Sequence, residues 1–406
     1  MKIIMTTLFG IEALVAEELT GLGYDRDNIT VNDGLVMLDA GDLSGQADRT
    51  AQAVARLNVN LRTAERILVQ LASFPATDFD MLFESTRDLP WENWLAPGVA
   101  FHVNGYSRKS ALFGIPACQS LIKKAIVDRL LAARRLPAGS FLPEDPEIGL
   151  IKIQFGLVSD VVSMMVDTSG EGLHKRGYRP LQHEAPIKET LAAAMLMVSR
   201  FQPFSDEAVF DPCCGSGTIP IEAAMMAFQI APGLNRPFSG ENWHLIGSRP
   251  FALAREEAMA RMDLHPPEQP FIFGSDLSPR AIEVSQANCR RAGVEPMVRF
   301  KTADLFKWSL ADLEAWTGHS RHLVICNPPY GERLLDVEQA EELYAGIGRI
   351  FLDRGMAHQG VRLSVISPHE DFENLAGGRA DKRRKLYNGM IRCTLFHYFK
   401  QRRTDR

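Results

Sequence analysis

The residues best suited to chemistry form the run Asn327-Pro328-Pro329-Tyr330. The run follows an apolar segment, 323–326, that predicts a buried strand, and open α/β sheets bind ligands at the carboxyl ends of their strands. The Asn327 side-chain carbonyl can accept an N–H from an exocyclic amine on a planar base. Because two consecutive prolines have fixed φ angles and no N–H, the Pro328 carbonyl can be a second, rigid acceptor. Tyr330 offers a flat face on which the base can stack.

These four residues are therefore candidate catalytic residues for a reaction in which an amine nitrogen attacks a group that is transferred to it. Two acceptors would draw the amine toward a tetrahedral shape and so make its lone pair a better nucleophile. The alternative interpretation is structural: a strand that ends in an Asn-Pro turn, with Tyr330 packed against its neighbours.

Acidic residues follow three other predicted strands. Asp211 begins the loop Asp211-Pro212-Cys213-Cys214-Gly215-Ser216-Gly217-Thr218, and Asp276 and Asp304 end the next two strands. We expect Asp211 to orient the loop and receive an ammonium group, Asp276 to accept both hydroxyls of a ribose, and Asp304 to accept an adenine amine. These groups make up S-adenosylmethionine, the predicted cofactor. The alternative is three unrelated aspartates at strand ends.

The glycine-containing loop also excludes two other ligands. Gly215-Ser216-Gly217 is followed by Thr218-Ile219-Pro220, so the third glycine of a dinucleotide-binding loop is missing. No Gly-Lys-Ser/Thr follows, so the loop is not a P-loop. The cofactor-binding residues that we predict are Asp211, Pro212, Cys214, Gly215, Ser216, Gly217, Thr218, Asp276, Leu277, Asp304, Leu305, Glu189 and Thr190.

Strands and helices alternate over the last two hundred residues, which is typical of a doubly wound, mostly parallel sheet. Predicted strands cover 208–210, 271–273, 298–302, 322–326 and 362–366, and predicted helices cover 191–198, 219–226 and 279–292. An antiparallel strand is expected at 391–399. The interval 225–270 interrupts the first crossover and is interpreted as an insertion with a charged helix at 251–262.

The first 166 residues have a mixed α+β pattern. Predicted strands cover 1–9, 29–38, 66–74, 101–105, 151–155 and 161–166, and predicted helices cover 11–22, 51–64 and 118–135. The alternation of apolar and polar residues in 151–155 predicts pairing with 161–166. The polar, glycine-punctuated segment 172–179 and the segment 185–190 are expected to form a linker, with Pro186 opening the next helix and Lys188 and Glu189 in its first turn.

The charges are segregated along the chain, although the net charge is −5. Residues 1–50 carry nine acidic and three basic side chains, whereas residues 101–135 carry seven basic and one acidic. Residues 373–406 carry ten basic and three acidic side chains. Such segregation favours a localised surface that binds a polyanion. The alternative is solvated helix faces and a basic tail.

Two family resemblances accompany these patterns. The run Ser107-Arg108-Lys109-Ser110, followed by 119–126, resembles the core of a THUMP domain, an RNA-binding module, and the residues before it resemble the ferredoxin-like unit that accompanies THUMP. The loop that begins at Asp211 and the motif that begins at Asn327 resemble those of class I methyltransferases that methylate amines. Over essentially all 406 residues the chain resembles THUMP-containing RNA methyltransferases similar to the large-subunit rRNA guanine-N2 methyltransferase.

The resemblance implies an α/β Rossmann-like class I methyltransferase domain preceded by a ferredoxin-like and THUMP RNA-binding region. It also implies methyl transfer from S-adenosylmethionine to guanine N2 in 23S rRNA, by in-line displacement. Related proteins can carry a second methyltransferase domain that this sequence does not show, so tRNA remains an alternative target. The expected domains are 1–48 (ferredoxin-like), 49–166 (THUMP), 167–190 (linker and start of the cofactor-site helix) and 191–406 (methyltransferase). The expected RNA contacts are Arg108, Lys109, Lys123, Lys124, Lys382, Arg383 and Arg384.

The sequence leaves three alternative functions open. A DNA adenine-N6 methyltransferase or a protein glutamine methyltransferase would use the same Asn-Pro-Pro-Tyr chemistry, and a noncatalytic RNA-binding or ribosome-assembly factor could retain a vestigial cofactor site.

The hydrophobic fraction of 46% and the charged fraction of 23% are typical of a soluble globular protein. Without an apolar run of membrane-spanning length or a signal pattern, the expected compartment is the cytoplasm. Six scattered cysteines predict free thiols and no metal site.

Overall fold

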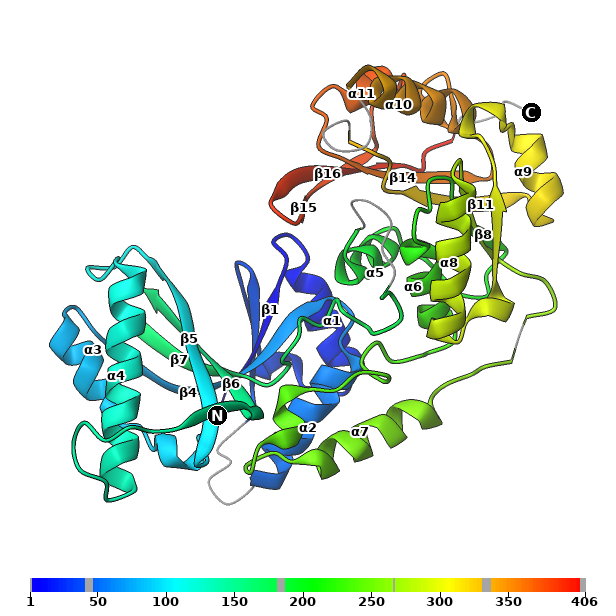
Figure 1. Ribbon diagram of the computed structural model, residues 1–406. Helices are drawn as coiled ribbons and strands as arrows, with labels where there is room; N and C mark the ends of the chain where they lie inside the picture. Colours follow the sequence, from blue (N-terminus) through cyan, green and yellow to red (C-terminus); the bar gives the residue numbers. More distant parts are fainter. Residues whose placement is uncertain (1, 41–46, 181–186, 266, 331–336, 402–406) are drawn as a thin grey trace. The chain divides into compact units, whose positions relative to one another are not determined.

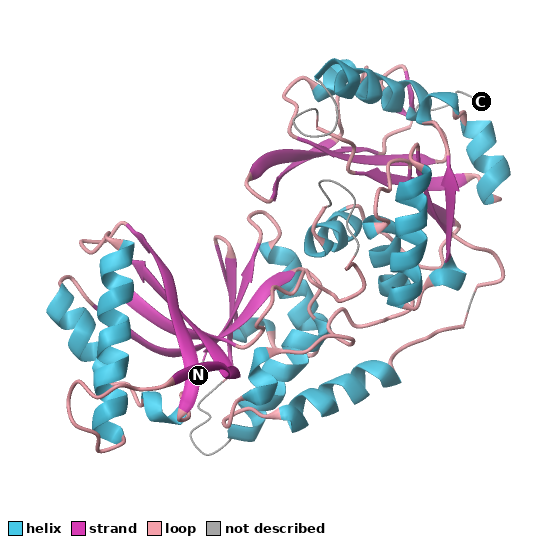
Figure 2. Cartoon of the chain, in the orientation of Figure 1, coloured by secondary structure: helices cyan, strands magenta, loops and turns pink. Residues whose placement is uncertain are grey.

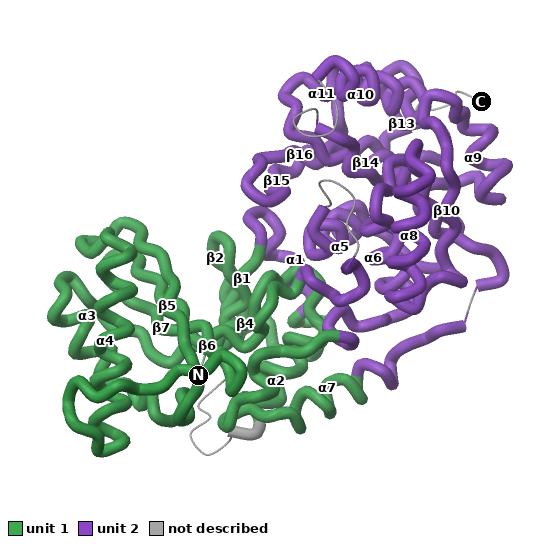
Figure 3. The backbone as a smooth tube through the Cα atoms, in the orientation of Figure 1, with its two compact units in different colours: residues 1–7, 19–173, 236–257 green, residues 8–18, 174–235, 258–406 purple. Residues whose placement is uncertain are grey.

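The structure is a computed structural model that describes residues 2–40, 47–180, 187–265, 267–330 and 337–401. Two compact units make up the chain (Figure 3). Unit 1 contains Met1–Thr7, Leu19–Leu173 and Arg236–Glu257, and unit 2 contains Leu8–Glu18, His174–Asn235 and Ala258–Arg406. Each unit is therefore made of three segments that alternate along the chain, whereas each predicted domain is one continuous stretch of sequence. Ala185 and Pro186, which we expected before the cofactor-site helix, lie outside the described residues.

Unit 1 is built on one seven-stranded sheet with the order β2-β3-β1-β4-β7-β6-β5. Its strands are β1 (Lys2–Thr7), β2 (Ile29–Asn32), β3 (Leu35–Asp39), β4 (Ala64–Pro75), β5 (Gly98–Arg108), β6 (Glu144–Val158) and β7 (Val161–Asp167). The predicted pairing of β6 with β7 is confirmed, in antiparallel register with Ile153 opposite Val166. Strand β5 is parallel to β6, and it begins before and ends after the predicted strand at 101–105.

The helices assigned wholly or partly to unit 1 are α1 (Glu12–Gly21), α2 (Ala47–Asn60), α3 (Phe79–Arg87), α4 (Ile115–Ala133) and α7 (Ser248–Ala260). Helix α4 buries Ile122, Ala125, Ile126 and Leu130 along one stripe, because their spacing places them on the same face of a helix. No helix of the described residues is both long and apolar enough to cross a membrane.

The central part of the predicted insertion folds with unit 1 rather than with the sheet that it interrupts. Arg236 is buried, and its guanidinium donates to the carbonyl oxygens of Gly172 at 2.6 Å and Glu171 at 2.8 Å. Arg255 forms an ion pair with Glu241 at 2.6 Å. A buried guanidinium is stable only where acceptors surround it, so these carbonyl contacts anchor the segment in unit 1.

Unit 2 has a second seven-stranded sheet, of order β10-β9-β8-β11-β14-β16-β15 (Figure 1). Its strands are β8 (Glu207–Asp211), β9 (Ile272–Asp276), β10 (Val298–Thr302), β11 (Arg321–Cys326), β14 (Val361–Ser367), β15 (Lys382–Asn388) and β16 (Ile391–Tyr398), and a small separate pair is formed by β12 (Leu352–Asp353) and β13 (Met356–Ala357). The first five strands of the order are parallel, and β16 and β15 are antiparallel to their neighbours. The predicted doubly wound, mostly parallel sheet is confirmed.

Figure 2 draws the helices in cyan; those wholly within unit 2 are α5 (Glu189–Val198), α6 (Thr218–Ala227), α8 (Pro279–Ala292), α9 (Leu310–Thr317), α10 (Val337–Phe351) and α11 (Phe372–Leu375). Local sequence explains their ends. For example, the Ser278 hydroxyl caps α8 by accepting the Ala281 N–H, Pro279 occupies its first turn, and Gly293 closes it at φ +74°.

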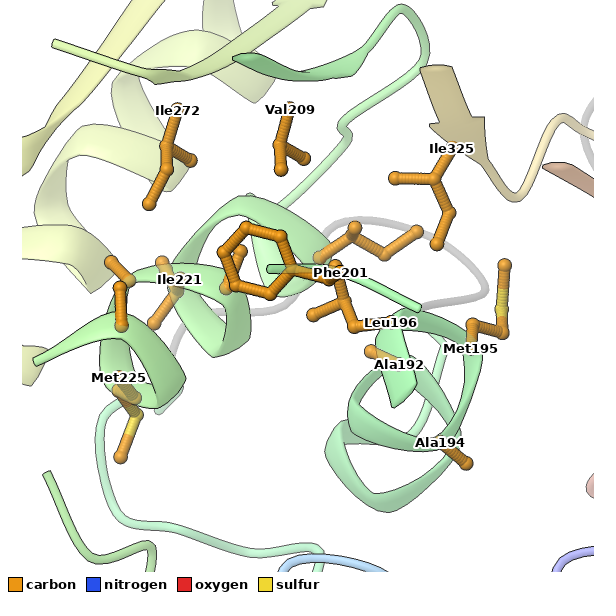
Figure 4. Close-up of a cluster of buried hydrophobic side chains, with 14 of the residues drawn as sticks. Ala192, Ala194, Met195, Leu196, Phe201, Val209, Ile221, Met225, Ile272 and Ile325 are labelled. Atoms are coloured by element: carbon orange, nitrogen blue, oxygen red, sulfur yellow. The ribbon is translucent and has the colours of Figure 1, made fainter. Parts of the chain in front are cut away.

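Alternating residues of the strands cover the two faces of this sheet. Val209, Ile272 and Ile325 point toward α5 and α6, where they pack with residues such as Leu196 and Ile221 (Figure 4). Their neighbours Phe210, Phe273 and Val324 belong to a second core that includes Tyr344 and Phe351 of α10. Because both faces are covered, the central strands are apolar almost throughout, as their sequences predicted.

Candidate active site

A cavity of about 1090 Å³ opens at the carboxyl ends of the parallel strands of unit 2. Asp211 ends β8, Asp276 ends β9, and Asp304 and Asn327 follow β10 and β11; all four line the cavity. Strand β8 lies between β9 and β11 in the sheet, and the strand order reverses there. Such a switch point leaves a crevice beyond the strand ends in which open α/β sheets bind ligands.

Most of the predicted site residues line this one cavity. They are Asp211, Pro212, Cys214, Gly215, Ser216, Thr218, Asp276, Leu277, Asp304, Leu305, Asn327, Pro328, Pro329 and Tyr330. Three predicted cofactor-binding residues are not in the lining: Gly217, Glu189 and Thr190. The lining also contains residues that the sequence argument missed, among them Lys188, Phe306, Gln339, Glu342 and the segment 388–391.

The loop after β8 is held in a shape that only glycine adopts easily. Gly215 has φ +52° and Gly217, the N-cap of α6, has φ +80°. A Cβ at Gly217 would lie 2.8 Å from the Ser285 Cβ, whereas a Cβ at Gly215 would meet nothing within 4 Å. Gly217 therefore allows the loop to pack against α8, and Gly215 leaves backbone open for close approach of a ligand.

Asp276 has a structural role in addition to the predicted one. Its two carboxylate oxygens accept the Gly215 N–H at 2.9 Å and the Ser278 N–H at 3.0 Å. Each carboxylate oxygen has a further lone pair, so both can still accept a hydroxyl. Asp276 therefore joins the loop after β8 to the start of α8 and faces the cavity.

Asp211 and Asp304 also cap their own loops. Asp211 is buried and accepts the Cys213 N–H at 3.1 Å, and burial raises the pKa of its carboxyl well above the ordinary value. Asp304 is half-buried, accepts the Phe306 N–H at 3.0 Å and lies 3.5 Å from the Lys307 ammonium. The predicted contacts of these aspartates with an ammonium and an adenine amine remain predictions.

The candidate catalytic residues at 327–330 take part in hydrogen bonds that the sequence did not reveal. The Tyr330 hydroxyl donates to the Asn327 side-chain oxygen and accepts from the Asn388 side-chain amide at 3.2 Å. Tyr344 donates to the Pro329 carbonyl at 3.2 Å. Burial raises the pKa of Tyr330 well above its usual range, so the hydroxyl stays protonated and can donate. These hydrogen bonds fix the Asn327 side-chain amide. The amide oxygen keeps a second lone pair that can accept a hydrogen bond from a ligand.

The cysteines of the loop are poor candidates for a nucleophile. Burial raises the pKa of both Cys213 and Cys214 well above the ordinary thiol value. Because the thiolate is the reactive form, both side chains act as small packing residues. The described residues contain no group of three or more His, Cys, Asp or Glu side chains that could hold a metal ion.

Glu189 does not line the cavity but forms a buried ion pair with Arg179. Its carboxylate lies 3.1 Å from the Arg179 guanidinium, which also donates to the Thr218 hydroxyl at 2.7 Å and the Ile187 carbonyl at 2.8 Å. Thr218 and Ile187 line the cavity. The expected linker residue Arg179 thus connects the start of α5 to the start of α6, and Glu189 positions that guanidinium.

Replacing Glu189 by alanine is expected to lower the free energy of unfolding by about 3–5 kcal/mol, because it leaves the Arg179 charge buried without its partner. Guanidinium unfolding followed by tryptophan fluorescence measures this. Asp206→Ala, which breaks an exposed pair with Arg321, is the matched control and should cost about 1 kcal/mol or less. Equal losses in the two variants would contradict the positioning role.

Three family matches cover most of the chain. Residues 176–397 match UPF0020, the RMKL-like methyltransferase domain. Residues 2–68 match the RlmL ferredoxin-like domain, and residues 76–138 match the THUMP domain. The chain belongs to this family of methyltransferases. The predicted class I methyltransferase fold behind a ferredoxin-like and THUMP region is confirmed.

Named relatives support the same assignment. “Putative RNA methyltransferase YpsC” of Bacillus subtilis is 38% identical over 100% of this chain and 97% of its own length. Ribosomal RNA large subunit methyltransferase K/L of Syntrophotalea carbinolica is 31% identical over 98% of this chain, which spans only 53% of that relative. The crystal structure of SMU.472 complexed with SAH is 37% identical, with a TM-score of 0.83 over 99% of this chain and 98% of that chain.

The predicted cofactor fits both the family and the cavity. SAH is the demethylated form of S-adenosylmethionine, and the family is one of methyltransferases. The free space beside Gly215 and the carboxylate of Asp276 suit the amino-acid and ribose parts of this cofactor. The cofactor of this chain is S-adenosylmethionine, as predicted. The individual contacts remain predictions.

Proposed function

We propose that this protein transfers a methyl group from S-adenosylmethionine to the exocyclic N2 amine of a guanine in RNA, and that the target lies in 23S rRNA. The observation that carries the proposal is the Asn327 side chain, which lines a large cavity at the switch point of a methyltransferase sheet and whose amide oxygen accepts a hydrogen bond from the Tyr330 hydroxyl. The Tyr330 hydroxyl fixes that oxygen. A fixed acceptor is what a delocalised amine requires to be held for attack.

We expect one set of cavity residues to bind the cofactor and another set to hold the amine that is methylated. The loop at Gly215, together with Asp276 and Asp304, would hold the cofactor, which supplies an activated methyl group when bound. Asn327 and the Pro328 carbonyl would accept the two amine hydrogens and direct the nitrogen lone pair inward. The half-buried Tyr330 ring would stack on the guanine. No covalent nucleophile is needed, in keeping with the raised thiol pKa of Cys213 and Cys214.

RNA is favoured over other acceptors by the THUMP match at 76–138 and by the names of the relatives, which are an RNA methyltransferase and an rRNA methyltransferase. Because the chain spans about half the length of the K/L relatives, the 23S rRNA target is a proposal, and tRNA is the alternative within the same chemistry. A DNA adenine target would use the same Asn327 contacts, but it would leave the THUMP region without a role.

Mass spectrometry of nucleosides tests the proposal. Ribosomal RNA, tRNA and DNA are purified from cells with and without this protein, and their methylated nucleosides are compared. Loss of N2-methylguanosine from large-subunit rRNA is expected. Loss from tRNA alone would move the target, and loss of N6-methyladenine from DNA would refute an RNA acceptor. If calorimetry detects no S-adenosylmethionine binding, a noncatalytic RNA-binding factor becomes the better explanation.

The residues that we predict to contact RNA lie in both units. In unit 1, Arg108 ends β5, Lys109 follows it, and both are exposed. Lys124 on α4 is exposed, whereas Lys123 forms an ion pair with Glu144 at 3.0 Å. In unit 2, Lys382, Arg383 and Arg384 belong to β15, where Arg383 pairs with Glu373. We therefore expect Lys109 and Lys124 to contribute more charge to RNA than the paired Lys123 and Arg383.

Reversing the charge of Lys109 and Lys124 to glutamate should weaken RNA binding and lower the slope of log affinity against log salt by about one for each lost phosphate contact. Filter binding of labelled rRNA at several salt concentrations measures both quantities. Lys2→Glu changes an exposed lysine on β1 and is the control. An unchanged salt slope in the double variant would show that this surface does not bind RNA.

A further inference from the structure

The hairpin of β15 and β16 presents one apolar side chain at the mouth of the cavity. Asn388 pairs with Ile391, so the turn consists of Gly389 and Met390 alone. Gly389 has φ +63°, as two-residue hairpin turns require at their first position. Met390 is 99% exposed, more than any other large hydrophobic residue among those the structure describes.

Single exposed apolar residues are common, but the position of this one is specific. Met390 lines the cavity together with Asn388, Gly389 and Ile391. Asn388 donates to the Tyr330 hydroxyl, which in turn donates to Asn327. The turn therefore belongs to the acceptor end of the cavity, where the amine to be methylated would lie.

The base of the hairpin is firmly held. Leu386, Cys393 and Leu395 are buried in the core on one face of the sheet, and Phe396 stacks on Phe372 with 4.6 Å between ring centroids. At Gly10 a Cβ would lie 2.6 Å from the Lys385 carbonyl oxygen, so backbone of the segment Leu8–Glu18 packs closely against β15. Because the base of the hairpin is fixed, the exposed tip can press against a bound molecule without being displaced.

The strand that leads to the tip carries positive charge. Lys382, Arg383 and Lys385 are exposed on β15, and Arg384 is half-buried. A polyanionic backbone following these residues would bring its bases to the turn. Side chains that enter a nucleic acid stack in such positions are apolar, and methionine is among those that proteins use as wedges. Its unbranched, polarizable side chain adapts to neighbouring bases.

We propose that Met390 inserts into the stack of a base-paired RNA and fills the place that the target guanine leaves when it turns into the cavity. The inference rests on the proposed function, because a guanine within a helix cannot bring its amine to Asn327 without leaving the stack. Unstacking costs a few kcal/mol per step, and an inserted side chain restores part of that loss. The substrate class is thus a paired guanine rather than one in an open loop.

The experiment uses the full chain and transcripts of the RNA in which the methylated guanine has been mapped by nucleoside mass spectrometry. One transcript keeps the nucleotide opposite that guanine, and the other lacks it, so that the guanine is bulged and already easy to extrude. Single-turnover transfer of tritiated methyl groups is measured at saturating RNA. Met390→Ala is expected to slow transfer about tenfold on the paired transcript and less than about twofold on the bulged one.

Two further variants make the result specific. Met390→Leu keeps a long apolar side chain and should retain the wild-type rate within about twofold on both transcripts. Met259→Ala removes an exposed methionine that does not line the cavity and should change neither rate. Calorimetry should give the same cofactor affinity for all variants.

An equal defect of Met390→Ala on the two transcripts, or no defect on either, would overturn the wedge role. A mapped guanine that has no pairing partner in the folded RNA would also overturn it. If the wild-type protein labels no RNA at all, the proposed function itself fails, and the role of Met390 fails with it.

Discussion

Asn327→Ala is expected to lower the rate of methyl transfer to RNA by about 10²–10³-fold, the size of effect seen when one oriented polar group is removed from an active site. Affinity for S-adenosylmethionine should stay within about twofold of the wild-type value. The physical reason is that Asn327 is predicted to hold the acceptor amine, whereas the glycine loop and Asp276, which also line the cavity, are predicted to hold the cofactor. Single-turnover kinetics and calorimetry provide the two measurements.

Tyr330→Phe separates the two predicted contributions of this motif. The variant keeps a ring for stacking but removes the hydroxyl that orients Asn327. We expect a smaller loss of rate, about fivefold, because one neutral hydrogen bond contributes about 1 kcal/mol. If the cofactor affinity of Asn327→Ala fell together with its rate, Asn327 would be a cofactor ligand and the proposed role would be wrong.

Asp276→Ala is expected to have the opposite pattern and to weaken S-adenosylmethionine binding by about 10²–10⁴-fold. Two hydrogen bonds to a charged acceptor contribute about 1.5–3 kcal/mol each, and the Gly215 N–H loses its partner as well. The rate at saturating cofactor should change less than about threefold. Isothermal calorimetry with S-adenosylmethionine and with SAH gives the affinities.

The control for this variant is Asp206→Ala, which removes an exposed carboxylate from the end of a surface ion pair. It should leave cofactor affinity unchanged. Asp276→Asn, which retains one carbonyl acceptor, should lie between alanine and wild type. An unchanged affinity in Asp276→Ala would mean that the ribose hydroxyls bind elsewhere.

Much of unit 2 is predictable because its signals are local. Buried strands such as β8 and β11 contain short apolar runs; the polar Asp211 ends β8 and the polar Asn327 follows β11. Parallel strands bring their carboxyl ends to one edge, so the order of strands and helices along the chain is enough to place Asp211, Asp276 and Asn327 together. Gly217 is also predictable, since its φ of +80° is a property of the loop itself.

The basic strand β15 escapes prediction for a physical reason. It lies at the edge of the sheet, and only Leu386 among its residues is buried. Edge strands often carry lysine and arginine, which discourage pairing with other chains. The apolar alternation that reveals a strand is therefore absent, and the sequence of this segment indicates only a basic tail.

The sequence by itself determined the two classes of fold, the glycine loop and the polar residues at the strand ends, because each depends on neighbours within a few positions. Only the tertiary structure decided that Asn388 and Met390 join Asn327 at the cavity, that Glu189 pairs with Arg179, and that Arg236–Glu257 folds with unit 1. These arrangements bring together residues from distant parts of the chain. Packing and the pairing of buried charges select them, and neither leaves a periodic pattern in the sequence.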